Sequence, residues 1–294
     1  MDDEEWLAGR FEEHRPRLRA MAYRMLGSLA EADDAVQDAW ERVSNARGGE
    51  VENLGGWLTT IVARVCLNAL RSRKARREDA AGVFVPDPIV TTDGRALPED
   101  AALMADSVGL ALQVVLDTLS PAERLAFVLH DIFDLPFEEI GPMMSRTIPA
   151  TRQLASRARR RVRGAEVPAP EQDLARQRTV VNAFFAAARV GDFDALVAAL
   201  HPDVVLRADF SPRRPGSSTV IRGAAAVARQ ARLGASPAAE VRAALVNGMA
   251  GVVITRHGRP FVIMAFTIYQ GRITEINAVG DPERAYRLAA AVLT

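Results

Sequence analysis

The sequence predicts a multidomain protein in which two all-α helical domains precede a C-terminal α+β domain. Apolar residues recur at helical spacing over residues 6–75 and again from about 103 to 163, whereas strand-like segments separated by glycine-containing turns follow residue 200. Two stretches without periodicity, 78–102 and 165–172, part these regions. We therefore expect domains over 1–77, 103–164 and 173–294, joined by two linkers.

The composition is that of an ordinary globular protein. Of 294 residues, 49% are hydrophobic and 25% are charged, which suffices for two or three domains with their own cores. No apolar stretch approaches the roughly 18 residues that span a bilayer, and the acidic start, MDDEEWLAGR, lacks the pattern of a secretory signal. A single cysteine, Cys66, excludes an internal disulfide. We expect a cytoplasmic protein.

The formal net charge is zero, but the charges are clustered along the chain. Residues 71–77 (RSRKARR) and 157–163 (RARRRVR) each contain five basic residues in seven, while acidic residues gather at 2–5 and 31–41. Because local patches set the field that a DNA phosphate meets, the basic clusters point to nucleic-acid binding. The alternative is that each cluster is only a solvated helix end.

Helix start and stop signals divide the first domain. Gly27 suits a C-cap, and Ser28 followed by the acidic segment 31–34 starts a second helix that runs to about Arg47. Apolar residues then recur at helical spacing from Trp57 to Leu70, up to the first basic run.

The segment 120–163 predicts a helix-turn-helix. Ser120, Pro121 and Glu123 form a strong helix start, and residues 137–144 form a short helix that ends in a turn at 145–146. Thr147 then caps a second helix whose first turn contains Pro149.

Along this second helix Leu154, Ala158 and Val162 repeat every four residues and are expected to face inward. The opposite rows carry long polar side chains that can reach base edges and phosphates, as a recognition helix in the major groove requires. These side chains are Arg152, Gln153, Ser156, Arg157 and Arg160.

The C-terminal part has a different pattern. A helical pattern covers about 173–200, and further helices are expected at about 222–233 and from Pro282. Strands are expected at 204–208, 241–247, 252–255, 261–269 and 273–279. Helices followed by a meandering antiparallel sheet indicate an α+β domain.

Three sequence blocks carry a resemblance to a known family. EADDAVQDAW (31–40), GGWLTTIVARVCLNALRSRKARR (55–77) and LSPAERLAFVLHDIFDLPFEEIGPMMSRTIPATRQLASRARRRV (119–162) resemble regions 2 and 4 of extracytoplasmic-function sigma factors. The resemblance implies an alternative sigma factor that binds core RNA polymerase, recognises the minus-ten and minus-thirty-five promoter elements and initiates transcription. It implies no catalytic residue and no cofactor.

The resemblance also implies which residues make each contact. The surface for core polymerase would be formed by Asp33, Asp34, Gln37 and Trp40. The minus-ten element, melted to single strands, would be bound by Trp57, Arg64, Asn68, Arg71, Arg73, Lys74, Arg76 and Arg77. The minus-thirty-five duplex would be bound by Pro149, Thr151, Arg152, Gln153, Ser156, Arg157 and Arg160.

The chain from Ala175 onward resembles a SnoaL-like domain, the cone-shaped fold of ketosteroid isomerases. One group of extracytoplasmic-function sigma factors carries such a fusion, in which the domain is similar to a built-in regulator that makes a separate anti-sigma factor unnecessary. FVPDP (84–88) resembles the WLPEP linker motif of that group, and DPERAYRL (281–288) resembles its closing NPDKL-type motif. The expected glycine-rich DGGG segment is replaced by residues 209–215.

These motifs imply a regulatory interface between the linker and the cone. Its expected members are Phe84, Pro86, Asp87, Pro88, Asp209, Asp281, Pro282 and Arg284. We expect the cone to set the spacing between the two DNA readers through the segments 84–88 and 281–288.

Cones of this kind include enzymes, so a catalytic alternative is open. An isomerase needs a carboxylate base and a hydrogen-bond donor to an enolate. Asp209 is the best candidate base, but no pattern places a second acid or a histidine beside it. The other candidates are His201, His257, Tyr269 and Tyr286. We expect no enzyme, and the scattered histidines predict no metal site.

Two further alternatives remain open. The chain could be an autonomous helix-turn-helix regulator with a ligand-binding or enzymatic C-terminal domain. A small apolar ligand in the cone is also possible, because the strand residues expected to point inward are mostly apolar. They are Val205, Val253, Phe261, Ile263, Ala265 and Ile276.

Overall fold

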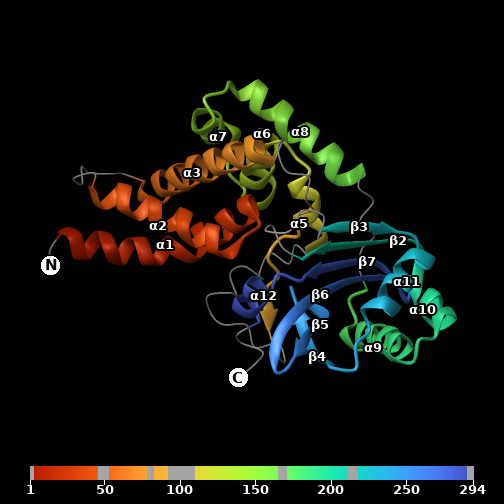
Figure 1. Ribbon diagram of the computed structural model, residues 1–294. Helices are drawn as coiled ribbons and strands as arrows, with labels where there is room; N and C mark the ends of the chain where they lie inside the picture. Colours follow the sequence, from red (N-terminus) through yellow and green to blue (C-terminus); the bar gives the residue numbers. More distant parts are fainter. Residues whose placement is uncertain are drawn as a thin grey trace. The chain divides into compact units, whose positions relative to one another are not determined.

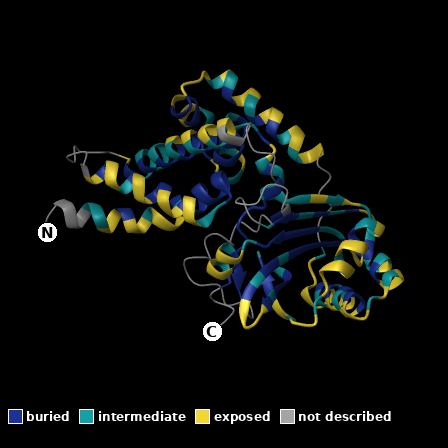
Figure 2. Ribbon diagram, viewed as in Figure 1, coloured by how far each residue is buried: buried dark blue, intermediate teal, exposed yellow. Residues whose placement is uncertain are grey.

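The computed structural model describes residues 3–45, 53–77, 83–91, 110–164, 171–210 and 218–289. They fall into two compact units. The helical unit contains residues 3–45, 53–77 and 112–164, and the sheet unit contains 83–91, 110–111, 171–210 and 218–289. Each unit has its own layers of buried residues (Figures 1 and 2).

Three long helices form the first part of the helical unit: α1 (Asp3–Leu26), α2 (Leu29–Asn45) and α3 (Leu54–Arg77). The break between α1 and α2 lies where the sequence places it. Gly27 takes a positive φ and donates its N–H to the carbonyl of Tyr23, and Ser28 Oγ accepts from the N–H of Glu31. Asn53 caps α3 by accepting from the N–H of Gly56 at 2.9 Å.

The second part contains α5 (Leu110–Asp117), α6 (Pro121–Phe127), the π-helical turn η1 (Val128–Ile132), α7 (Phe137–Met143) and α8 (Ile148–Gly164). Ser120 and Glu123 form a complete capping box at the start of α6. The turn between α7 and α8 depends on Gly141, because a Cβ there would lie 3.0 Å from the carbonyl oxygen of Arg146. Helices α7 and α8 thus form the expected helix-turn-helix.

A buried polar cluster joins the two parts of the helical unit. Arg124 is 2% exposed, and its Nε and Nη2 donate to the carbonyl of Arg24 at the end of α1. Gln113, fully buried, donates to the carbonyls of Tyr23 and Arg24, while Asp117 pairs with Arg124 at 3.0 Å. The carbonyl of Arg24 lies in the last turn of α1, where helical carbonyls lack intrahelical donors, and these side chains satisfy it.

The sheet unit begins with α9 (Leu174–Val190) and α10 (Phe193–Ala199), and α11 (Ala224–Gly234) and α12 (Pro282–Leu288) follow. Its strands are β1 (Val90–Thr91), β2 (Leu200–Asp209), β3 (Thr219–Arg222), β4 (Ala239–Val246), β5 (Met249–Arg256), β6 (Arg259–Tyr269) and β7 (Arg272–Val279). They lie in the order β1-β4-β5-β6-β7-β2-β3.

Strands β4 to β7 form the expected antiparallel meander. Its three turns, 247–248, 257–258 and 270–271, each place two residues at positive φ, the conformation of type I′ turns that matches strand twist. The expectation of an antiparallel sheet throughout is wrong at one place, because β2 pairs with β7 in parallel. Strand β2 precedes the meander in the chain but lies beside its last strand, β7. Parallel neighbours need a long crossover connection between them.

The segment 83–91 belongs to the sheet, so the expectation of a linker across 78–102 is wrong for these residues. Val90 and Thr91 pair with Val246 and Leu245, and the backbone N–H of Ile89 donates to the side chain of Asn247 at 2.8 Å. Val85 is fully buried. Pro86 and Pro88 interrupt any periodic pattern, which is why the sequence carries no strand signal here.

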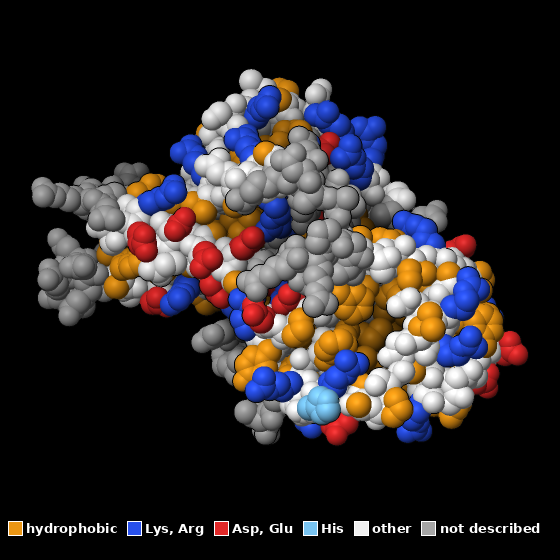
Figure 3. Space-filling model, viewed as in Figure 1, with side chains coloured by type: hydrophobic (Ala, Val, Ile, Leu, Met, Phe, Trp, Pro, Cys, Tyr) orange, Lys and Arg blue, Asp and Glu red, His pale blue; other side chains and the backbone are white. Residues whose placement is uncertain are grey.

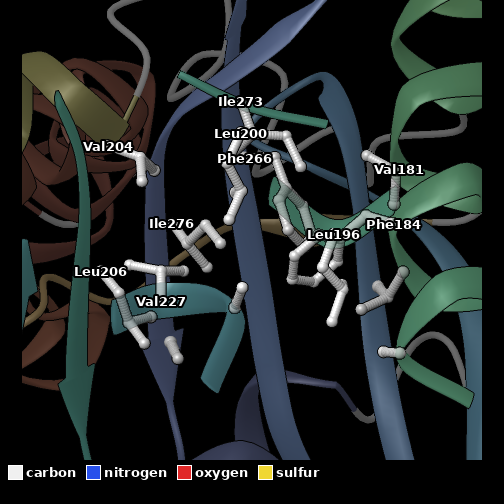
Figure 4. Close-up of a cluster of buried hydrophobic side chains, with 14 of the residues drawn as sticks. Val181, Phe184, Leu196, Leu200, Val204, Leu206, Val227, Phe266, Ile273 and Ile276 are labelled. Atoms are coloured by element: carbon white, nitrogen blue, oxygen red, sulfur yellow. The ribbon is translucent and has the colours of Figure 1, made fainter. Parts of the chain in front are cut away.

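The two faces of the sheet bury separate cores. Helices α9, α10 and α11 cover one face, and Figure 4 shows side chains such as Phe184, Leu196 and Phe266 meeting between helices and strands. The second core includes Val85, Val90 and Ala285.

The apolar set expected to line one cavity is therefore divided. Ile276 and Phe261 pack with the helix-covered core, whereas Val253, Ile263 and Ala265 lie in the second core. On β6, Ile263 and Ala265 alternate with Val262 and Phe266 of the helix-covered core. Phe261 has the parity of Ile263 but lies near the register shift between β5 and β6 at Thr255. The expectation that they all point inward is wrong. Val205 is only partly buried.

None of the helices in the described residues is both long and apolar enough to cross a membrane.

Replacing Arg124 with methionine is expected to lower the free energy of unfolding of the helical unit by about 3–5 kcal/mol, because the carboxylate of Asp117 loses a buried cation and the Arg24 carbonyl loses two donors. Denaturant unfolding followed by tryptophan fluorescence measures this unit alone, since Trp6, Trp40 and Trp57 all belong to it. The control is Arg159→Met, which breaks only the partly exposed ion pair with Asp131 and is expected to cost less than about 1 kcal/mol. Equal losses in the two variants would contradict the role given to Arg124.

Candidate nucleic-acid interface

Helix α8 carries a polar exposed face. Ala155 and Ala158 are fully buried, and Leu154 and Val162 are partly buried on the opposite side. Lys and Arg side chains gather over α8 in Figure 3. The exposed residues include Pro149, Arg152, Gln153, Ser156, Arg157 and Arg160. This face is free to meet a duplex.

Thr151 is the exception among the residues expected to contact the minus-thirty-five duplex. It is fully buried, and its hydroxyl donates to the carbonyl of Thr147 at 3.0 Å. Thr151, Ala155 and Ala158 are spaced four and three residues apart, so they share the inward face of the helix. The expectation of a DNA contact by Thr151 is wrong.

Two arginines of α8, Arg157 and Arg161, lie close to the carboxylate of Glu123 on α6. Glu123, almost fully buried, accepts from Arg161 at 2.9 Å and lies 3.9 Å from Arg157. It also accepts from the hydroxyl and the backbone N–H of Ser120. Burial acts to raise the pKa of Glu123, but the hydrogen bonds from Ser120 and the charges of Arg161 and Arg157 outweigh it, so the pKa lies below its ordinary value of 4.5.

A second basic face lies along α3. Trp57 is partly exposed, and Arg64, Asn68, Arg71 and Lys74 are exposed. The intervals between Trp57, Arg64, Asn68 and Arg71 are seven, four and three residues, so these side chains form one stripe along the helix.

Arg73 does not belong to this stripe. It donates to the carbonyl of Leu26 at 2.8 Å and pairs with Glu31, so it holds α3 against the junction of α1 and α2. The expectation that Arg73 binds phosphate is wrong for this arrangement of the side chain. The side chains of Arg76 and Arg77 lie outside the described residues.

A hollow of about 510 Å³ lies in the helical unit. Arg73 and Lys74 of α3 and Arg161 of α8 line it, together with Asp117 and Glu123. Cations of α3 and α8 therefore share this hollow with two carboxylates.

The acidic face of α2 contains the residues expected to bind core polymerase. Asp33 pairs with Arg19 at 2.6 Å, whereas Asp34 and Gln37 are exposed. Trp40 is partly buried against the ring of Phe11, with the ring centroids 4.8 Å apart. Figure 3 shows acidic side chains gathered over α1 and α2. The face thus combines negative charge with a half-exposed indole beside a hollow of about 200 Å³.

In the sheet unit, Arg284 joins three segments that are far apart in the sequence. Its guanidinium donates to the carboxylates of Asp87 and Asp209, the latter at 2.9 Å, and to the carbonyl of Val85. The ring of Phe84 lies 5.2 Å from the guanidinium carbon. We call Val85, Asp87, Asp209 and Arg284 the Arg284 cluster.

The other residues of the expected regulatory interface surround this cluster. Asp281 caps α12 by accepting from the N–H of Arg284 at 2.8 Å, and Pro282 is exposed in the first turn of α12. Pro86 and Pro88 are buried. Residues 211–217, in the segment that replaces the glycine-rich motif, lie outside the described residues.

The candidate catalytic groups of the cone are not brought together. Asp209 is occupied by Arg284 and by the hydroxyl of Ser218 at 3.2 Å. His201 is partly exposed and accepts from the N–H of Asp203 at 3.2 Å, and His257 is a turn residue at positive φ. Tyr269 is partly exposed, and Tyr286 is 57% exposed. Among the described residues no group of three or more His, Cys, Asp or Glu side chains is arranged to hold a metal ion. Burial raises the pKa of the Cys66 thiol to about 12, so it stays protonated.

A helix-turn-helix with an exposed arginine-rich face, beside a second basic helix in the same unit, defines a DNA-binding protein. Residues 10–76 match the Sigma-70 region 2 family, and residues 109–162 match the Sigma-70 region 4 family.

Relatives extend this match to almost the whole chain. The ECF RNA polymerase sigma factor SigJ of Mycobacterium tuberculosis (strain ATCC 25618 / H37Rv) is 34% identical over 93% of this chain and 91% of its own length. The probable ECF RNA polymerase sigma factor SigI of the same species is 34% identical over 92% of this chain and 91% of its own. The crystal structure of SigJ matches with a TM-score of 0.71 at 33% identity, covering 94% of this chain and 97% of that one.

The chain belongs to the extracytoplasmic-function RNA polymerase sigma factors. Its sheet unit has an α+β fold, a seven-stranded sheet with helices α9, α10 and α11 on one face.

Replacing Glu123 with glutamine is expected to destabilise the helical unit at pH 7 and to have less effect in acid. The folded-state pKa of Glu123 lies below its unfolded value, so the stability that its charge contributes is present above about pH 4.5 and is lost as the pH falls through the folded-state pKa. Tryptophan-monitored unfolding of both proteins at pH 7 and pH 3.5 measures the difference. A difference that is unchanged or larger at pH 3.5 would show that the carboxylate charge plays no part.

Proposed function

We propose that this protein binds core RNA polymerase through the acidic face of α2, reads the minus-ten element with α3 and reads the minus-thirty-five element with α8. The observation that carries the proposal is the presence of two separate exposed basic helix faces in one chain, each within a matched sigma region. A helix-turn-helix regulator acting without polymerase would need only one of these faces.

The two faces suit different forms of DNA. On α8 the exposed arginines and Gln153 project from a helix narrow enough to enter the major groove, where such side chains pair with guanine and adenine edges. On α3 the partly exposed Trp57 offers a stacking surface, and Arg64, Asn68 and Arg71 follow it along the same stripe of the helix. Aromatic rings for the bases and cations along the backbone are the usual combination for single-stranded nucleic acid.

The α2 face supports the docking proposal in a different way. Asp34 and Gln37 are exposed next to the half-buried ring of Trp40, so the face offers both charge and an apolar anchor. Protein interfaces combine aromatic anchors with polar rims in this manner. As a partner of RNA polymerase the protein would act in the cytoplasm.

Regulation is proposed to act through the segment that connects the two readers. Residues 83–91 lie in the chain between α3 and α5, and they are built into the sheet by β1 and by the Arg284 cluster. Holding this segment fixes residues 83–91 within the connection between α3 and α5. The C-terminal domain would thereby set the spacing of the readers, and no separate anti-sigma factor is needed.

Because the sheet unit holds part of the connection, deleting it after Gly164 would expose the buried residues Val85, Ile89 and Val90. Point variants of the full chain test the proposal more cleanly.

Transcription in vitro with purified core polymerase, on the promoter upstream of the protein's own gene, is expected to show specific initiation. Arg71→Ala and Arg160→Ala should each lower it at least about fivefold, since each removes a base or phosphate contact. Arg189→Ala, an exposed arginine of α9, serves as the control and should leave initiation unchanged. If the wild-type protein starts no specific transcript, here or on a genome-wide promoter pool, the sigma assignment of function is wrong.

Arg284→Leu is expected to release residues 85–91 from the sheet unit, because it leaves the carboxylates of Asp87 and Asp209 facing each other without their shared cation. Hydrogen exchange should quicken at these amides. On promoters whose spacing between elements is varied by one or two base pairs, the wild-type protein should show a sharp optimum and Arg284→Leu a broader one.

The matched control is Arg287→Leu, an exposed arginine on the same helix. It should keep both the exchange rates and the spacing optimum of the wild type. An unchanged spacing profile in Arg284→Leu, despite faster exchange, would overturn the proposed regulation.

A further inference from the structure

The recognition helix α8 is flanked by acidic side chains from three different elements. Arg161 pairs with Glu123 of α6, Arg159 pairs with Asp131 of η1 at 2.5 Å, and Arg152 pairs with Glu138 of α7 at 3.3 Å. The basic run of α8 is therefore not a set of equivalent cations.

The pairing divides α8 into a centre and two edges. At 3.6 residues per turn, Arg152 and Arg159 lie on one edge of the exposed face, and Arg157 and Arg161 lie on the other. Between them are Gln153, Ser156 and Arg160, which are exposed and form no side-chain hydrogen bond or ion pair among the described residues. The arginines at the edges lie close to acidic side chains, whereas the residues at the centre are exposed to solvent.

Arg152 is the edge residue that contacts both a carboxylate and an aromatic ring, although its side chain is 61% exposed. Its guanidinium carbon lies 5.7 Å from the centroid of the Phe137 ring, and Phe137 in turn stacks on His130 with the centroids 3.9 Å apart. Glu138 contacts one nitrogen, Nη2, of the same guanidinium. The aromatic ring and the carboxylate thus restrict the orientation of the Arg152 guanidinium. Its remaining N–H donors can still bind a base edge.

The restricted orientation of Arg152 affects whether it contacts phosphates or base edges. Phosphate contacts by mobile cations supply sequence-independent binding, whereas a guanidinium fixed in direction gains only where a base edge is aligned with it. An acid that competes with phosphates for an arginine therefore weakens binding to any sequence more than binding to the correct one.

We propose that Glu138 is a positioning residue that determines promoter specificity, by holding Arg152 in the orientation for one base pair of the minus-thirty-five element and keeping it from phosphates. The inference rests on the proposed reading of that element by α8. Phe137 supplies the surface on which Arg152 is held.

The chain contains a matched control next to Glu138. Glu139 is exposed on the same helix and makes no ion pair among the described residues. Glu138→Gln and Glu139→Gln change the net charge equally, so any difference between them reports the contact with Arg152.

The test uses holoenzyme reconstituted from the full chain and core polymerase, on promoters in which each base pair of the minus-thirty-five element is varied singly. Glu138→Gln should lower discrimination at one base pair about two- to fivefold, the range of an exposed ion pair, and should raise binding to a scrambled element. Glu139→Gln should keep wild-type discrimination. Arg152→Ala should lose discrimination at the same base pair, and adding Glu138→Gln to it should change nothing further.

The outcomes separate the inference from the function on which it rests. If Glu138→Gln behaves like Glu139→Gln while Arg152→Ala and Arg160→Ala weaken initiation, the positioning role is wrong and the reading of the element by α8 stands. If neither arginine variant affects initiation, the proposed function of α8 fails and the inference fails with it. A specific loss that spreads evenly over all base pairs would also overturn it, because that is the mark of a structural defect.

Discussion

A buried guanidinium must find an acceptor for each of its N–H donors, and this constraint organises the helical unit. Arg124 is almost fully buried, so its donors are directed to the Arg24 carbonyl at the end of α1 and to Asp117. The end of α1 has carbonyls without intrahelical donors, and Arg124 and Gln113 supply them. The buried guanidinium needs acceptors and the carbonyl at the helix end needs donors, so each satisfies the other. The consequence is that the helices of region 2 and the helices that lead into the helix-turn-helix share one buried polar contact.

The same principle recurs in the sheet unit with Arg284. Two carboxylates, Asp87 and Asp209, and the Val85 carbonyl converge on it, from a connecting segment and from the end of β2. Two carboxylates at such proximity would repel each other without a shared cation, so the cluster depends on α12 being present. Helix α12 is therefore the element that joins the segment between α3 and α5 to the sheet. The departure from the glycine-rich motif after Asp209 leaves Asp209 itself in this contact.

Charge is also arranged by pairing around helix α8. The chain has as many acidic as basic residues, yet the acids of α6, η1 and α7 lie where they can hold arginines of α8. Net charge says little about such a surface. A recognition helix with only free arginines would bind any duplex, and the pairing leaves Gln153, Ser156 and Arg160 as the uncommitted centre.

Local signals in the sequence determined the helix boundaries, the capping box of Ser120 and Glu123, the helix-turn-helix, the type I′ turns of the meander and the polar face of α8, because each depends on residues within a few positions of one another. Thr151 faces inward with Ala155 and Ala158 at helical spacing, which is a local pattern that the sequence contains. Only the tertiary structure decided that Arg73 binds Leu26 and Glu31, that β2 runs parallel to β7 and that residues 83–91 enter the sheet. These outcomes depend on partners distant in the chain, which periodicity does not report. The tertiary structure also decided that Glu123, Asp131 and Glu138 pair with arginines of α8, because these pairs depend on how α6, η1 and α7 pack against α8.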